Sequence, residues 1–378
     1  MLVLLLFLIS TAATVPLTEE ENSSLQVTCG NRKLSTRARR SMNTPEATRR
    51  EGPWSVALKY VSYLGDNVDL FNSSEVVCTG TLISSRHVLT AAHCFQQVEE
   101  SDCSNSQILE AGYDFFETET NLDNYLVVAP EVCLGENCIT EFTKPKPRGM
   151  RIKKITLSRE YILGKCYNAH FNQWQGDVAV LELEKDVEFS DFVQPACLST
   201  ELLEPRTDLT MFGFGTSMQV AAEHNQTVKT PTGVLRKLET STKDICTLKA
   251  ANHENLICSS DVKSLACGGD SGSGQITFRK DGKADVSGIL VAGTYCWVAF
   301  DRFIKGEDID AEDLNVIVSR HNWWICQATG NCPGNSKDQA VFERVKLESA
   351  LKELKLLGHP DTELAYRRPV DTVYDLMP

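Results

Sequence analysis

Three short motifs place chemically active side chains along the chain. His93 lies in "LTAAHC", Asp177 in "GDVAVLEL" and Ser271 in "CGGDSGSG". A serine hydroxyl is a useful nucleophile only when a base takes its proton, and an imidazole oriented by a carboxylate is such a base. Each motif alone also has a plain explanation, namely a core histidine, a turn aspartate or a glycine-rich turn. Their order along the chain is one in which Ser-His-Asp triads occur, and it favours acyl-transfer chemistry.

The segments around these motifs predict the elements that must position them. Residues 41 to about 332 consist of short β-branched runs such as "PWSVALKYV" and "VSGILVAGTYCWVAF", broken by Gly, Pro, Asn and Asp. That pattern is typical of an all-β domain with long loops. Residues 333–378 contain "KDQAVFERVKLESALKELKLLG", whose apolar residues follow helical spacing. We therefore expect a β domain at 41–332 and a C-terminal helical extension.

The N-terminal composition indicates secretion. The chain opens with "MLVLLLFLISTAATVP", which is typical of a signal peptide over residues 1–15 and too short for a membrane anchor. Residues 16–40 read as a polar propeptide that ends in the basic run "RKLSTRARR". Fourteen cysteines suit an oxidising compartment, and their spacing contains no zinc-binding C-x-x-C. Glycosylation sequons occur at Asn22, Asn72 and Asn225.

The net charge limits the class of partner. It is −13, and the basic residues cluster only near residues 32 to 40. A nucleic-acid partner is therefore not expected. No motif calls for a cofactor or a metal ion.

Several further stretches carry a family resemblance over residues 41 to about 327. "PWSVAL", "CTGTLISSRHVLTAAHC", "FVQPACL", "FGFG" and "SGIL…AGTYC" match in order. On these motifs the chain resembles secreted trypsin/chymotrypsin-like serine proteases, with features of the divergent branch found in nematodes. The resemblance implies two six-stranded antiparallel β-barrels, with a long insertion at 99–171 in the first barrel.

The resemblance also implies a role for each residue of the triad. Ser271 would be the nucleophile, His93 the general base and acid, and Asp177 the residue that orients the imidazole. The backbone N–H groups of Gly269 and Ser271 would form the oxyanion hole. We therefore expect an endopeptidase whose partners are protein or peptide substrates and protein inhibitors.

Activation follows by the same resemblance. An activating protease would cut after Arg40, and the new Ser41 amine would pair with Asp270. The apolar residues that usually begin the mature chain are absent here, because the new terminus reads "SMNT".

Disulfides are implied in the same way. Four pairs are expected, the first of which ties the propeptide to the body: Cys29–Cys197, Cys78–Cys94, Cys246–Cys258 and Cys267–Cys296. The sequence leaves the pairing of six further cysteines open: Cys103, Cys133, Cys138, Cys166, Cys326 and Cys332.

The residues expected at the specificity pocket predict an apolar preference. Leu265, followed by Ala266, stands where trypsin-like relatives carry the Asp that binds Arg or Lys, and Gly293 should keep the pocket mouth open. Asp313 aligns with the opposite wall of the pocket floor. Because the preceding stretch is rich in acids, we favour a solvated loop charge at Asp313 over a substrate contact.

Some departures from the family pattern leave an alternative open. Val291 stands where a serine usually supports the triad aspartate, and Ser273 and Gly274 replace the usual Gly-Pro. A secreted binding protein that keeps the scaffold without turnover is therefore the alternative to an active protease. A purely structural or adhesive protein would leave the coincidence of the three motifs unexplained.

Overall fold

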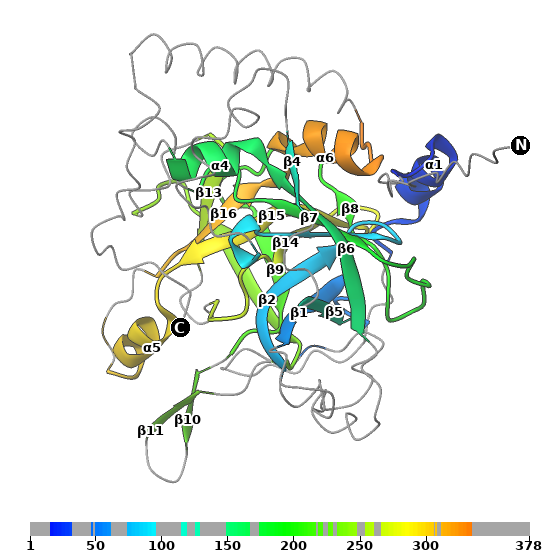
Figure 1. Ribbon diagram of the computed structural model, residues 1–378. Coiled ribbons are helices and arrows are strands. Elements are labelled where there is room, and N and C mark those ends of the chain that lie inside the picture. The colour runs from blue at the N-terminus through cyan, green and yellow to red at the C-terminus, as the bar shows by residue number, and fades with distance from the viewer. Residues whose placement is uncertain are drawn as a thin grey trace, which may run out of the picture.

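The computed structural model describes residues 16–31, 47, 50–61, 74–95, 115–118, 125–128, 149–166, 174–216, 218–221, 226–229, 233–247, 254–260, 266–305, 307 and 311–334. These residues form two antiparallel β-barrels that lie side by side, with short helices at their margins (Figure 1). The predicted signal peptide and the predicted C-terminal extension beyond residue 334 lie outside the described residues. Within the described part, no helix is long and apolar enough to cross a membrane.

The first barrel is a closed ring of six strands. Its order is β6-β5-β1-β2-β3-β7, with β6 and β7 paired to close the ring and β4 added beside β6. The strands are β1 (Ser55–Val61), β2 (Ser74–Leu82), β3 (His87–Thr90), β4 (Phe115–Thr118), β5 (Tyr125–Val128), β6 (Gly149–Ser158) and β7 (Ala179–Leu183). The predicted insertion at 99–171 therefore includes two strands of the barrel itself.

The second barrel is closed in the same way. Its order is β14-β9-β12-β13-β16-β15, with β14 paired to β15, and β8 runs parallel to β15. The strands are β8 (Cys197–Leu198), β9 (Asp208–Gly213), β12 (Arg236–Thr242), β13 (Leu256–Ser260), β14 (Gly274–Phe278), β15 (Ala284–Gly293) and β16 (Asp313–Ile317). A separate hairpin consists of β10 (Met218–Ala221) and β11 (Gln226–Lys229). The predicted two-barrel fold is confirmed.

The remaining elements are short helices. They are α1 (Glu19–Thr28), η1 (Ala92–Cys94), α4 (Arg159–Cys166), α5 (Cys296–Ile304), η5 (Val318–Arg320) and α6 (Asn322–Thr329). Helix α1 begins with a capping box, in which Thr18 and Glu21 satisfy each other's backbone N–H groups. Helix α6 ends where Gly330 adopts φ 73°, a left-handed conformation that glycine tolerates.

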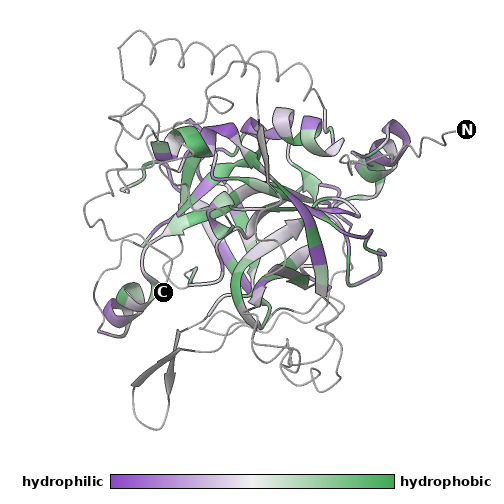
Figure 2. Ribbon diagram, in the orientation of Figure 1, coloured by the Kyte–Doolittle hydropathy of each residue, from purple (hydrophilic) through white to green (hydrophobic). Residues whose placement is uncertain are grey.

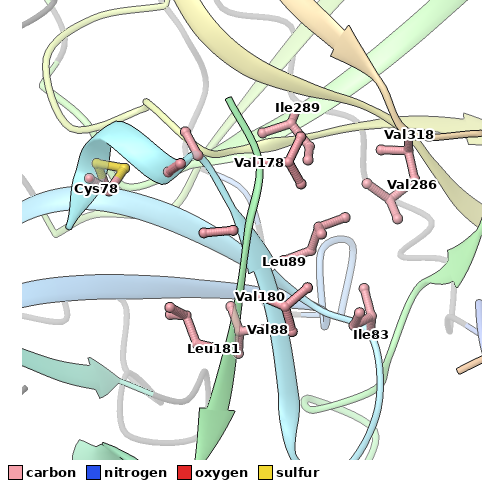
Figure 3. Packing of buried hydrophobic residues seen from close by; sticks show 14 of the residues in the cluster. Cys78, Ile83, Val88, Leu89, Val178, Val180, Leu181, Val286, Ile289 and Val318 are labelled. Atoms are coloured by element: carbon pink, nitrogen blue, oxygen red, sulfur yellow. A yellow bond between two sulfur atoms is a disulfide. The ribbon is translucent and has the colours of Figure 1, made fainter. Parts of the chain in front are cut away.

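The core joins the two barrels. One cluster of buried apolar side chains includes Leu89 and Val180 from the first barrel and Val286 and Ile289 from the second. Figure 3 shows these side chains packed where the strands of the two barrels meet. Apolar residues are concentrated along the strands at the centre of the molecule (Figure 2). Because both barrels pack on the same cluster, residues at this seam are held in a fixed relation to one another.

Candidate active site

His93 and Asp177 meet at the edge of the first barrel. His93 lies in η1, directly after β3, and Asp177 lies two residues before β7, which pairs with β3. The backbone N–H of His93 donates to Asp177 Oδ1 at 2.9 Å, and the ring Nδ1 lies 2.8 Å from Oδ2. With the Nδ1 proton directed at the carboxylate, Nε2 is left as the basic nitrogen. This is the geometry that a general base requires.

The turn before Asp177 depends on a glycine. Gly176 has φ 67°, and a Cβ at this position would lie 2.5 Å from the Cβ of Glu160 in α4. Glycine is therefore needed both for the conformation and for the close approach of the helix. The "GD" in "GDVAVLEL" thus has a local structural cause.

Asp177 is fully buried, and its charge is compensated. Burial alone would raise the pKa of this carboxyl, but the charge of His93, its hydrogen bonds and the charge of Lys165 together lower the pKa below the ordinary value. Asp177 is therefore ionised at neutral pH. Val291 is buried in β15 without a hydroxyl to offer, so the carboxylate relies on His93 and the field of Lys165.

Ser271 lies beside this pair, on the loop that precedes β14. Its carbonyl oxygen accepts from the backbone N–H of Thr79 at 2.8 Å and lies 3.9 Å from Sγ of Cys94, the residue after His93. Gly272 has φ 81°, and a Cβ there would lie 2.0 Å from Thr90 Oγ1. Within the described part of the chain, the Ser271 hydroxyl makes no hydrogen bond to His93; such contacts are often long before a substrate is bound.

Three backbone N–H groups of this loop, those of Gly268, Gly269 and Ser271, donate to no described residue. Those of Asp270, Gly272 and Ser273 all do. The Gly269 and Ser271 groups are the two that the family resemblance assigns to the oxyanion hole. Gly269 has φ 94°, a backbone conformation that residues other than glycine rarely adopt. The arrangement offers two donors beside the serine.

Asp270 lies beneath the loop in a socket made by glycines. Its carboxylate accepts from the backbone N–H of Gly215 at 2.8 Å and from that of Cys267 at 2.9 Å. A Cβ at Gly213 would lie 2.1 Å from Asp270 Oδ1, which explains why "FGFG" carries glycine at both positions. Burial raises the pKa of Asp270 to about 6, although the two N–H groups and the charge of Arg236 act in the opposite direction.

The predicted pocket residues fall into two groups. Leu265 lies outside the described residues, as do Arg40 and Ser41. Ala266, Gly293 and Asp313 come together: Gly293 and Asp313 face each other in the β15–β16 ladder, and the Ala266 N–H donates to the Asp313 carboxylate. The Asp313 side chain is buried, so its interpretation as a solvated loop charge is wrong. The preceding acid, Glu312, is buried as well.

The structure contains the four disulfides that the family resemblance implies: Cys29–Cys197, Cys78–Cys94, Cys246–Cys258 and Cys267–Cys296. It also pairs Cys326 with Cys332, which the sequence left open. Cys166 is disulfide-bonded, and Cys103, Cys133 and Cys138 lie outside the described residues.

The sequon residues differ in their surroundings. Asn72 and Asn225 lie outside the described residues. The Asn22 side chain contacts the backbone of Cys332, with Nδ2 donating to the carbonyl at 3.5 Å and Oδ1 accepting from the N–H at 3.0 Å. A glycan on Nδ2 would compete with this contact.

The sequence did not single out Lys165, Trp174 and Thr79. Trp174 lies edge-on to His93, with ring centroids 6.5 Å apart, and the Lys165 ammonium lies 4.6 Å from the Trp174 ring centroid. Thr79 Oγ1 donates to the Gly269 carbonyl and accepts from the Phe214 N–H. Only the proximity of Trp174 to Asp177 in the chain could have drawn attention to it.

Comparisons with known proteins agree with this geometry. Residues 1–332 match the nematode trypsin-6-like family. The chain is 27% identical to the trypsin-like protease try-5 of Caenorhabditis elegans over 292 residues, which is 72% of this chain and 81% of that protein. It is 27% identical to phenoloxidase-activating factor 3 of Holotrichia diomphalia, with 65% and 63% covered. For the Spaetzle-processing enzyme of Drosophila melanogaster the identity is 26%, with 65% and 57% covered.

Proposed function

The chain belongs to the nematode trypsin-6-like family, and on that premise we propose that it is a secreted serine endopeptidase made as a zymogen. The observation that carries this proposal is the doubly hydrogen-bonded pair of His93 and Asp177, with the Ser271 loop alongside. A buried, ionised carboxylate that fixes one imidazole tautomer serves little structural purpose, whereas a general base needs it.

The reaction follows from these positions. Ser271 Oγ attacks the carbonyl carbon of the scissile peptide, and its proton passes to His93 Nε2. The negative charge that develops on the carbonyl oxygen is stabilised by the N–H groups of Gly269 and Ser271. The C–N bond then breaks as His93 returns the proton to the leaving amine. Water, activated by the same imidazole, releases the acyl group from Ser271.

Activation is part of the proposal. Cleavage after Arg40 would create an α-amine at Ser41, and Asp270 is a buried carboxylate without an ion-pair partner among the described residues. Its two backbone hydrogen bonds already hold it in place beneath the nucleophile loop. An ammonium group that reached Asp270 would neutralise it and fix the loop that carries Gly269 and Ser271.

The names of the relatives suggest the kind of substrate. One is called a phenoloxidase-activating factor and another a Spaetzle-processing enzyme. We propose that this chain likewise acts on protein substrates and needs an upstream protease for its own activation. Protein inhibitors are further expected partners.

An inactive, protease-like binding protein is the second candidate. It is favoured by Val291, which leaves Asp177 without the hydroxyl that usually supports it. That loss removes a hydrogen bond worth about 1 kcal/mol, which would slow the reaction without abolishing it.

Peptide hydrolysis by the processed, secreted protein tests the proposal. We expect cleavage of members of a peptide library, and a loss of several orders of magnitude in the Ser271→Ala variant prepared in parallel. N-terminal sequencing should place the new terminus at Ser41. Equal cleavage by the two proteins would refute the role of Ser271, and failure of the processed parent to cleave any peptide would favour the binding protein.

A further inference from the structure

Most buried carboxylates in the described part of the chain have a basic side chain beside them. His93 lies against Asp177, Lys153 against Glu182, Arg279 against Asp285 and Lys243 against Glu312. This is the expected arrangement, because a buried ionised carboxylate without a partner is costly. Asp270 and Asp313 have no such ion pair among the described residues, and both adjoin the nucleophile loop.

Asp313 begins β16 and faces the end of β15. It pairs with Gly293, and the Ala266 N–H donates to its carboxylate from the other side. The nucleophile loop is bonded to β15 through Gly272 and Leu290, and the Cys267–Cys296 disulfide ties the loop to the segment after Gly293. The carboxylate thus lies between Ala266 and Gly293, where the side chain of the residue before the scissile bond, P1, is expected.

One oxygen of this carboxylate has no partner. Asp313 Oδ1 is buried and accepts no hydrogen bond from any described group, and the side chain as a whole is 4% exposed. A Cβ at Gly293 would lie 2.6 Å from this oxygen. Glycine at 293 therefore makes room for Oδ1, and any other residue there would displace it.

The neighbouring acid shows what a structural carboxylate looks like in this protein. Glu312 is fully buried, yet Lys243 pairs with it and the Thr247 N–H donates to both of its oxygens, at 3.1 and 2.9 Å. The two residues are adjacent in the chain, but among the described residues only Glu312 has a cation beside it. Asp313 instead lies near a like charge, Asp270.

We propose that Asp313 binds the basic side chain of a Lys or Arg at P1, and that the enzyme therefore cleaves after basic residues although Leu265 replaces the usual acid. This inference rests on the proposed function, because it assigns the substrate class of the same site. It replaces the apolar preference expected from Leu265 and Ala266.

The electrostatic surroundings support this assignment. Burial raises the pKa of Asp313 to about 7, and the negative charge of Asp270 adds to the effect. An ammonium or guanidinium group that reached Oδ1 would supply the missing cation and the missing hydrogen-bond donor together. A Phe or Leu side chain would leave the carboxylate unpaired, or protonated.

The test compares matched peptides that differ only at P1 (Arg, Lys, Phe or Leu), on processed enzyme whose active sites have been titrated. We expect kcat/KM for Arg and Lys to exceed that for Phe by about 100-fold or more, as a desolvated ion pair implies. Asp313→Asn should abolish this preference, and a near-UV circular dichroism spectrum that matches the parent's checks that the variant is folded. The matched control is Asp301→Asn, an acid of the same segment that is 48% exposed and pairs with Lys305; it should keep the parental preference.

A binding measurement separates this inference from the proposed function. Fluorescent p-aminobenzamidine, an aromatic cation, should bind processed Ser271→Ala protein and lose about 100-fold in affinity when Asp313→Asn is added. Asp313-dependent binding supports the inference even if no peptide is hydrolysed. Absence of hydrolysis would contradict only the proposed function. An active enzyme that prefers Phe or Leu, or that keeps a basic preference after Asp313→Asn, overturns the inference and leaves the proposed function intact.

Discussion

Asp177 and Asp313 are both buried aspartates at the ends of barrel strands, yet their surroundings differ. Asp177 accepts two hydrogen bonds from His93, and its pKa lies below the ordinary value. Among the described residues Asp313 accepts from Ala266 alone, and its pKa is raised to about 7. Similar burial thus gives opposite shifts in pKa, because His93 donates to Asp177 and the charge of Lys165 acts on it, whereas Asp313 has no basic partner among the described residues. Asp177, whose oxygens both accept hydrogen bonds, is suited to hold the catalytic imidazole. Asp313, which has an oxygen without a described donor, is suited to bind a ligand.

Asp270 connects the two sites. It precedes Ser271 in the chain, and its charge acts on Asp313. If the Ser41 amine neutralises Asp270 after processing, the pKa of Asp313 falls and its ionised form becomes more available to a substrate cation. On this account, activation prepares the substrate-binding carboxylate as well as the oxyanion donors.

Substituting Asn for each of these two aspartates should give the largest difference in activity between them. Asp177→Asn should reduce kcat/KM by about 10⁴-fold for every peptide, because the imidazole loses the partner that fixes its tautomer. Asp313→Asn should leave hydrolysis of the Phe peptide within a few-fold of the parent. Steady-state kinetics on the two matched peptides measure both effects. If the two variants lost activity in parallel on both peptides, Asp313 would belong to the catalytic machinery instead.

Stability should show the cost of the unpaired carboxylate. A folded-state pKa raised from 3.8 to about 7 means that the folded chain holds the proton more tightly than the unfolded chain. The stability that protonated Asp313 contributes is therefore fully present below pH 3.8 and is lost progressively as the pH rises to about 7, by on the order of 4 kcal/mol in all. Urea unfolding of the unprocessed Ser271→Ala chain from pH 5 to pH 8 should show this decline. The decline in unfolding free energy should be smaller after Asp313→Asn and unchanged after Asp301→Asn. Equal declines in all three proteins would contradict the raised pKa of Asp313.

The preference for a basic over an apolar P1 residue should depend on pH. Only ionised Asp313 binds a cation, so the kcat/KM ratio of the Arg peptide to the Phe peptide should rise by up to tenfold per pH unit below the pKa. The rise should level off at about pH 7, or lower once Asp270 is neutralised. Taking the ratio cancels the pH effects that all substrates share at the triad. A flat ratio between pH 5 and pH 8 would mean that Asp313 does not titrate in contact with the substrate.

The smallest predicted effect concerns the contact of residues 17–29 with Arg86, the end of α6 and Cys332. Leu25 is buried, Arg86 pairs with Glu21, and Leu17 donates to the Thr329 carbonyl at 2.8 Å. Asn22 adds its two bonds to Cys332. The propeptide should therefore stay bound after processing even without its disulfide, in a Cys29→Ser, Cys197→Ser double variant.

Native mass spectrometry of that variant measures retention of the propeptide. Adding Asn22→Ala should weaken it by about fivefold, which corresponds to about 1 kcal/mol. The matched control is Ser23→Ala, because the Ser23 hydroxyl bonds only within its own helix. Complete loss of the propeptide on processing would show that the disulfide alone retains it.

The sequence predicted the fold well because the motifs are local. His93 follows β3 and Asp177 precedes β7, and because these two strands pair, the two residues meet. Gly269 was implied as an oxyanion donor by the resemblance, and its φ of 94° fits the need for glycine there. The strands β5 and β6 were hidden inside a segment that reads as an insertion.

The environment of Asp313 could not be predicted in the same way. The acids of the preceding stretch look alike in composition, yet Asp301 is half-exposed, Glu312 is buried with its own lysine, and Asp313 is buried without one. The difference between Glu312 and Asp313 depends on Lys243, which pairs with Glu312, and on Ala266 and Gly293, which surround Asp313; all three are distant from these acids in the chain. The contact between Lys165 and Trp174 depends on the packing of α4 and was equally hidden.

Covalent labelling of Ser271 is the most direct test of the proposed catalytic triad. Processed protein is treated with a fluorophosphonate, and the modified residue is identified by peptide mass spectrometry, beside His93→Ala and Asp177→Asn variants. We expect one label per chain, on Ser271. The labelling rate should be strongly reduced in both variants, because the hydroxyl reacts only when the imidazole takes its proton. An unlabelled Ser271 in processed, folded protein, or equal labelling in all three proteins, would contradict the proposed triad.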